Sequence, residues 1–177
     1  TGLGEIEGQG RMKQLPLDIL LGAQPDLDHF VQTDNEWVMQ HLRLQVEAAT
    51  PSPVPTYLWG GRGVGKTHLL KAIMHLVQSK GIGVGWMDAS SDSSLPFDPA
   101  WQWVLMDDVH LYDTLQQHNA FNWLVQAIHP PLGQSHAVMV SGDVPPQQLA
   151  LREDVRSRLS WGHVFEVHGL NDEMAAQ

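Results

Sequence analysis

The distribution of apolar residues along the chain predicts strands and helices in alternation. Short apolar runs favour strands, whereas apolar residues three or four positions apart favour a helix with one buried face. On this basis we expect strands at 56–59, 83–87, 103–106, 136–140 and 164–167. We expect helices at 36–49, 68–80, 115–128 and 153–159. This order predicts an α/β fold, in which a parallel five-stranded sheet is flanked by helices on both faces.

The first expected strand leads into a glycine-rich loop. The phosphate-loop pattern G-x-x-x-x-G-K-[ST] is matched at every fixed position by Gly60, Gly61, Arg62, Gly63, Val64, Gly65, Lys66 and Thr67. Glycine permits the sharp turns that bring backbone N–H groups close to phosphate oxygens. Lys66 supplies a mobile charge for the β- and γ-phosphates, and Thr67 supplies a hydroxyl for Mg²⁺. A helix that begins at His68 points its N-terminus at the anion, so we include His68 in the predicted nucleotide site.

Acidic and polar residues follow two of the later strands. Asp107 and Asp108 come directly after 103–106, and in open α/β sheets the carboxyl ends of strands face the ligand crevice. We expect Asp107 to hold Mg²⁺ and Asp108 to act as a general base on an attacking water. An aspartate pair that caps a loop is the alternative. Ser141 and Asp143 follow the next strand, where they could sense the γ-phosphate or orient water, or simply form a turn.

Two arginines lie in a helix near the end of the chain. Arg156 or Arg158 could act as an arginine finger, a cation inserted into the γ-phosphate site of another subunit. The alternative is a solvated pair matched to Glu153 and Asp154, and the residues alone favour it.

An alternating segment lies near the N-terminus. In an extended chain Leu15, Leu17 and Ile19 share one side. The segment could dock in the apolar groove of a partner. The alternative is an edge strand or simple N-terminal packing, and the spacing alone favours it.

Composition and charge narrow the possible classes. The 177 residues, 42% of them apolar, predict one domain, which we divide into a flexible N-terminal segment, 1–29, and a nucleotide-binding core, 30–177. A net charge of −10 argues against a broad DNA-binding surface, because phosphate contacts need clustered Lys and Arg. The absence of cysteine excludes disulfides and is typical of a cytoplasmic protein. No apolar run is long enough to cross a membrane.

The order of these features resembles the DnaA-type AAA+ ATPases over residues 30–172. The residues that carry the resemblance are Tyr57-Leu58-Trp59-Gly60, Gly65-Lys66-Thr67-His68-Leu69-Leu70, Asp107-Asp108-Val109-His110, Ser141-Gly142-Asp143-Val144-Pro145-Pro146-Gln147-Gln148-Leu149 and Ser157-Arg158-Leu159-Ser160-Trp161-Gly162. The last two stretches are much more specific than the phosphate loop. Within the family, the chain looks closest to the DnaA-related regulatory inactivators.

The resemblance implies a P-loop AAA+ core that binds ADP or ATP with Mg²⁺. Arg158 matches the arginine finger of the family, and Asp143 falls in its sensor segment. Residues 30–35 correspond to a segment that often lies over the base. The helical lid of the family is not expected in this chain, because the sequence stops at Gln177 soon after the last expected strand.

The resemblance also implies partners. The segment with Gln14, Leu15, Leu17 and Ile19 is similar to the motif by which the regulatory inactivators bind the replication sliding clamp. The implied partners are therefore the DnaA initiator, the clamp and a further copy of the chain, without strong direct DNA binding. The implied activity is stimulation of the hydrolysis of DnaA-bound ATP, which suppresses re-initiation, beside a weak ATPase of the chain itself. A self-sufficient P-loop ATPase, such as a helicase loader, is the alternative.

Overall fold

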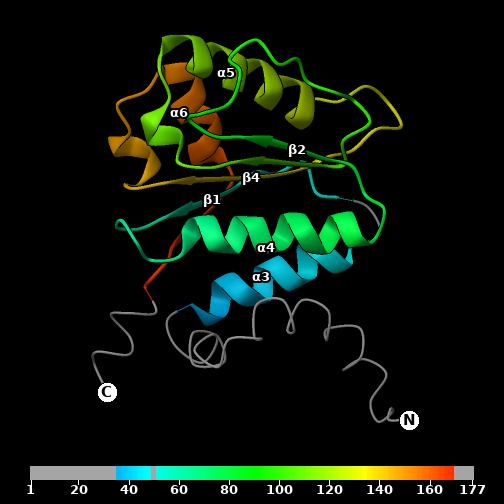
Figure 1. Ribbon diagram of the computed structural model, residues 1–177, viewed down its shortest axis with the longest axis horizontal. Coiled ribbons are helices and arrows are strands. Elements are labelled where there is room, and N and C mark those ends of the chain that lie inside the picture. Colours follow the sequence, from blue (N-terminus) through cyan, green and yellow to red (C-terminus); the bar gives the residue numbers. More distant parts are fainter. Residues whose placement is uncertain (1–34, 49–50, 170–177) are drawn as a thin grey trace.

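The structure, a computed structural model, describes residues 35–48 and 51–169 (Figure 1). The strands are β1 (Thr56–Trp59), β2 (Val84–Met87), β3 (Trp103–Met106), β4 (Ala137–Gly142) and β5 (His163–Glu166). The helices are α3 (Glu36–Glu47), α4 (Lys66–Ser79), α5 (Thr114–Ile128) and α6 (Glu153–Trp161), with short 3₁₀ helices η1 (Val109–Leu111) and η2 (Pro146–Gln148). Within the described ranges, no helix combines the length and apolar character that crossing a membrane requires. The expected flexible segment, 1–29, lies outside these ranges.

The five strands form one parallel sheet in the order β2-β3-β4-β1-β5. Helices α3 and α4 lie on one side of the sheet, and α5 and α6 lie on the other (Figure 1). The predicted α/β fold with a parallel five-stranded sheet is therefore confirmed. Because β4 lies between β3 and β1, the carboxyl ends of these three strands meet at the same edge of the sheet.

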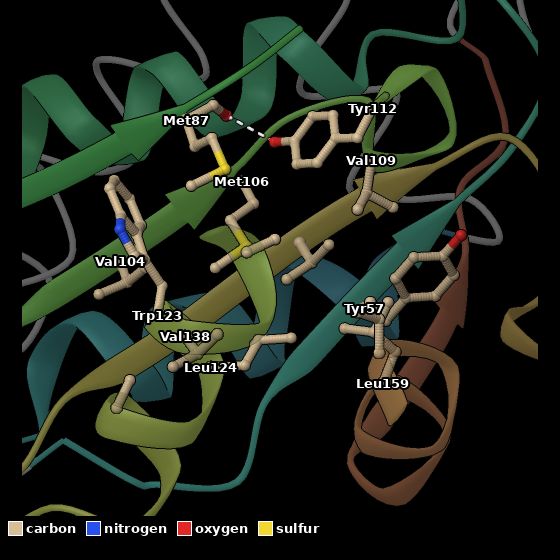
Figure 2. Packing of buried hydrophobic residues seen from close by; sticks show 14 of the residues in the cluster. Tyr57, Met87, Val104, Met106, Val109, Tyr112, Trp123, Leu124, Val138 and Leu159 are labelled. Carbon is tan, nitrogen blue, oxygen red and sulfur yellow. Dashed lines mark hydrogen bonds between the residues drawn. The ribbon is translucent and has the colours of Figure 1, made fainter. Parts of the chain in front are cut away.

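Both faces of the central strands β1, β3 and β4 are buried. Leu58 and Leu105 pack toward α3 and α4, whereas their sequence neighbours Tyr57 and Val104 pack toward α5 and α6. Figure 2 shows part of the second cluster, which includes Trp123 of α5 and Val104 of β3. Burial on both faces explains why the strands read as continuous apolar runs rather than as an alternation of apolar and polar residues.

Three elements extend two residues beyond their expected ends, among them α6, which ends at Trp161 rather than at 159. Helix α4 begins at Lys66 rather than at 68, directly after Gly65, whose φ of 102° is left-handed. Strand β4 continues to Gly142, two residues beyond the expected range of 136–140. Ser141, which the sequence places after the strand, therefore lies inside the sheet.

The N-terminal end of α3 is held by a contact that the sequence did not predict. Asparagine is a common N-cap residue, but the Asn35 side chain makes no cap. Instead, Asn35 Nδ2 donates to the carbonyl of His168 at 2.7 Å, and its Oδ1 accepts from the N–H of His168 at 2.9 Å. Because Asn35 is fully buried, this reciprocal pair joins α3 to the chain that follows β5.

His41 of α3 lies against the edge strand β5. Its ring centroid is 4.6 Å from that of His163 and 5.1 Å from that of Phe165, and its Nε2 lies 2.8 Å from Oγ1 of Thr56. Burial, and to a smaller extent the charge of a protonated His163, lowers the pKa of His41 to about 4. The contact between α3 and β5 thus requires a neutral ring.

We expect this contact to weaken in acid. Between about pH 6.5 and pH 4 the unfolded chain takes up a proton at His41 while the folded chain does not, so stability falls as the pH falls through this interval. We expect the free energy of unfolding to fall by about 1–2 kcal/mol less in His41→Gln than in the wild type over this interval, as measured by denaturant unfolding at several pH values. This figure allows for solvent screening of a partly exposed ring. His75→Gln, at an exposed position of α4, is the control. An identical pH dependence in the wild type and His41→Gln would contradict the assignment.

Candidate functional site

The loop between β1 and α4 has the backbone conformation that its glycines require. Gly63 and Gly65 have positive φ values of 79° and 102°. At Gly60 a Cβ atom would lie 2.5 Å from the carbonyl oxygen of Val167, so the loop packs directly on the chain that follows β5. The first N–H groups of a helix have no acceptor within the helix and point beyond its N-terminus. The start of α4 therefore favours an anion at the loop.

Lys66 is a buried cation held by the loop itself. Its side chain is 6% exposed, and Nζ donates to the carbonyls of Gly60 at 2.6 Å and Gly61 at 3.0 Å. Burial lowers the pKa of Lys66, although the carboxylates of Asp108, Asp143 and Asp107 oppose this. Among the described residues, no carboxylate lies within ion-pairing distance of Nζ. A buried positive charge with only carbonyl partners favours an anionic ligand.

Thr67 and Asp107 meet although they lie on different elements. Thr67 Oγ1 donates to Oδ2 of Asp107 at 2.7 Å, and Ser141 Oγ donates to Oδ1 of Asp107 at 2.7 Å. Mg²⁺ in phosphate sites is held by one or two carboxylates together with phosphate oxygens and water. Over 35–48 and 51–169, no three His, Asp or Glu side chains gather closely enough to hold a metal ion themselves. Thr67 and Asp107 therefore fit a Mg²⁺ ion that arrives with a phosphate ligand.

Asp108 has an unusual backbone conformation. Its φ of 50° and ψ of 53° are left-handed, and it is the one non-glycine residue with a positive φ in the described part of the chain. Such conformations are costly and tend to occur at functional sites. Burial raises the pKa of Asp108, the charge of Asp107 raises it further, and His110 and Lys66 act in the opposite direction.

A cavity of about 700 Å³ brings most of the predicted residues together. Its wall consists of Asp108, Asp143 and the loop residues Gly61, Arg62, Gly63, Gly65, Lys66, Thr67 and His68, together with His110 and Leu111. Gly60, Val64 and Asp107 do not line it. Val64 packs on the apolar core, and Asp107 lies behind Thr67.

The structure adds two residues, His110 and Leu111, to the predicted set and changes the interpretation of Ser141. His110 lines the cavity, and its Nε2 lies 3.7 Å from Oδ2 of Asp143. Leu111 is exposed at the cavity wall. Ser141 is fully buried and contacts Asp107, so it is neither a phosphate sensor nor a turn residue. The sequence signal for both residues is their position shortly after the acidic pair, and His110 also belongs to one of the stretches that carry the family resemblance.

Arg158 lies outside the cavity of its own chain. Its guanidinium carbon is 4.8 Å from the ring centroid of Phe121, and Nη1 donates to the carbonyl of Asp154 at 3.1 Å. The expected ion pairs form only in part: Arg156 pairs with Glu153 at 3.2 Å, but the carboxylate of Asp154 pairs with Arg152. Gln14, Leu15, Leu17 and Ile19 lie outside the described residues, as do residues 30–34.

Comparison with known proteins agrees with this geometry. Residues 21–91 match the family model of the bacterial DnaA ATPase domain. The chain is 27% identical over 169 residues to the chromosomal replication initiator protein DnaA of Leifsonia xyli subsp. xyli, which covers 85% of this chain. The chain is homologous to DnaA-type AAA+ ATPases. It spans 35% of the length of that DnaA protein.

A shorter relative matches over more of its length. An uncharacterized protein of Haemophilus influenzae is 28% identical over 170 residues, and the match covers 91% of this chain and 71% of that protein. This chain therefore also resembles a protein of which it spans more than two thirds.

Solved structures of DnaA have the same fold. The replication initiator DnaA bound to AMPPCP and single-stranded DNA matches with a TM-score of 0.64 at 20% identity, over 78% of this chain and 47% of that chain. Domain III of the Thermotoga maritima replication initiation protein DnaA matches with a TM-score of 0.62 at 21% identity, over 76% of this chain and 62% of that chain.

The exit of β4 toward Asp143 allows no side chain at Gly142. A Cβ atom there would lie 2.1 Å from the hydroxyl of Tyr57, which donates to the carbonyl of Val144 at 2.7 Å. We expect Gly142→Ala to cost about 1–3 kcal/mol in denaturant unfolding. The cost should be smaller in the Tyr57→Phe background, because the closest contact is then absent. Equal costs in both backgrounds would show that the hydroxyl is not what excludes the side chain.

Proposed function

We propose that this chain is a regulatory AAA+ protein resembling Hda, the DnaA-related regulatory inactivator. It binds ADP or ATP and stimulates hydrolysis of the ATP held by a DnaA initiator, which suppresses re-initiation of replication. The observation that carries the proposal is the separation of Arg158 from the phosphate cavity of its own chain. A cation in that position can serve the nucleotide of a neighbouring subunit, but not its own.

The proposed nucleotide lies over the phosphate loop. The N–H groups at the start of α4 and the ammonium of Lys66 contact its phosphates, and Thr67 with Asp107 holds Mg²⁺, which neutralises phosphate charge when bound. Asp143 and His110 line the same cavity. The DnaA structure bound to AMPPCP supports an adenine nucleotide as the ligand.

In the proposed complex Arg158 acts in trans. An arginine placed beside the γ-phosphate stabilises the charge that develops in the transition state and can raise the rate by about 10³–10⁵-fold. To reach that position the guanidinium must leave the ring of Phe121 and the carbonyl of Asp154. Both contacts are weak single interactions, and a phosphate offers a stronger, charge-assisted partner.

The proposed link to replication is the segment that contains Gln14, Leu15, Leu17 and Ile19. It lies outside the described residues, so the support comes from its sequence, which alternates apolar positions as an extended groove-binding peptide does. Binding the sliding clamp would bring Arg158 to DnaA where replication has begun.

One observation favours a second candidate, a self-sufficient P-loop ATPase. Lys66, Thr67 and Asp108 line the cavity of a single chain, and Asp107 contacts Thr67 from behind. A chain with these groups can hydrolyse its own ATP when a second copy supplies Arg158. Basal ATP turnover that requires Asp108, measured with Asp108→Asn, would favour this candidate.

The Arg158 proposal is tested by hydrolysis of DnaA-bound ATP, with this protein, clamp loaded on DNA and ADP each omitted in turn. We expect Arg158→Ala to lose the stimulation while it still binds nucleotide, because it lacks only the guanidinium that enters the site of DnaA. Arg156→Ala is the matched control, since Arg156 lies on the same helix and pairs with Glu153. Full stimulation by Arg158→Ala would remove the finger assignment. No stimulation by the wild type, together with turnover of its own ATP, would favour the second candidate.

The clamp-binding proposal is tested by pull-down with immobilised sliding clamp. We expect the double variant Gln14→Ala, Leu17→Ala to lose binding, because it removes one polar and one apolar anchor from the segment. The double variant Leu3→Ala, Gln9→Ala removes the same two residue types outside the segment and should bind as the wild type does. Unchanged binding by the first variant would contradict clamp binding by this segment and favour the alternative, an edge strand or simple N-terminal packing.

A further inference from the structure

One buried hydroxyl contacts both acidic residues at the end of β3. Ser141 is 0% exposed, in a strand whose six residues are all buried. Its Oγ donates to Oδ1 of Asp107 at 2.7 Å and accepts from the N–H of Asp108 at 2.9 Å. A serine hydroxyl carries one proton and two lone pairs, so both bonds can form at the same time. Ser141 therefore contacts the side chain of one aspartate and the backbone of the next.

The first of these bonds completes the support of the Asp107 carboxylate. Thr67 donates to Oδ2 and Ser141 donates to Oδ1, each at 2.7 Å. The terminal torsion of an aspartate is otherwise soft. With a hydroxyl on each oxygen, the plane of the carboxylate is held between α4 and β4. Without Ser141, only the bond from Thr67 would remain, and Thr67 is the residue that would have to turn toward Mg²⁺.

The second bond supports the strained backbone of Asp108. This residue is left-handed, with a φ of 50°, which is unfavourable for any residue other than glycine. Its N–H donates to Ser141, and its carbonyl accepts from the N–H of Leu111 at 3.0 Å. The two bonds hold the turn that presents Asp108 at the wall of the cavity. Asp143, two residues after Ser141 and directly after the end of β4, lines the same cavity.

We propose that Ser141 is a positioning residue for the acidic pair. It holds the Asp107 carboxylate in position to bind Mg²⁺ and holds the turn that places Asp108 at the cavity. Ser141 itself contacts neither Mg²⁺ nor the nucleotide. The inference rests on the proposed function, because it concerns how this chain would hold a nucleotide with Mg²⁺. If the hydroxyl only formed hydrogen bonds in the core, its removal would lower stability. It would not change how strongly Mg²⁺ increases the affinity for nucleotide.

The test separates the Mg²⁺-dependent part of nucleotide binding from the rest. A fluorescent ADP analogue is titrated with the full chain in Mg²⁺ and in EDTA, and the unfolding midpoint of each variant is measured alongside. We expect Ser141→Ala to weaken the apparent affinity for Mg²⁺ by about tenfold or more, as loss of residues that support metal ligands commonly does. Affinity in EDTA should stay close to that of the wild type. Ser141→Thr, which keeps the hydroxyl, should restore the Mg²⁺ response.

Ser79→Ala is the matched control, because it removes a serine hydroxyl that donates to the Leu76 carbonyl away from the site. Should Ser141→Ala not fold, Ser141→Cys replaces it, since a thiol has similar size but is a weak donor. An unchanged Mg²⁺ response in the alanine or cysteine variant, with a wild type that binds ADP, would overturn the role of Ser141 alone. A wild type that binds no nucleotide with or without Mg²⁺ would overturn the proposed function and, with it, this inference.

Discussion

The candidate site depends on the parallel direction of all five strands and on the place of β4 between β3 and β1. This arrangement brings the loop after β1, the acidic pair after β3 and the end of β4 to one edge of the sheet. Three residues that are distant in sequence, Thr67, Asp107 and Ser141, then form one chain of hydrogen bonds. Any change of strand order would separate these groups, whatever their local sequence.

The electrostatics of the cavity follow from the same convergence. A buried lysine and three aspartates lie near one another, yet Lys66 donates only to backbone carbonyls among the described residues. A low local dielectric strengthens the interactions between charges, so a buried charge without an opposite partner costs free energy. A phosphate that arrives with a divalent cation would place negative charge beside Lys66 and positive charge beside the aspartates, which is the arrangement in the proposed complex with a nucleotide and Mg²⁺.

The chain that follows β5 closes the opposite side of the phosphate loop. Val167 donates to the carbonyl of Trp59 at 2.7 Å, its own carbonyl faces Gly60, and His168 forms a reciprocal pair with Asn35. The start of α3 and the end of the described chain therefore meet beside the loop. The expectation that residues 30–35 lie over the base of a nucleotide can be followed in the structure only at Asn35, which lies at this junction.

The sequence by itself determined the elements and the chemistry of the phosphate loop. All five strands and four helices lie within about two residues of their expected ranges, since periodicity, glycine and proline act through local geometry. The tertiary structure alone decided that Ser141 contacts Asp107, that Asn35 contacts His168 rather than capping α3, and that Arg158 lies over Phe121. These contacts join residues 34, 133 and 37 positions apart, so no local pattern records them. They arise only when packing of the two apolar faces of the sheet sets the distance and direction of each side chain.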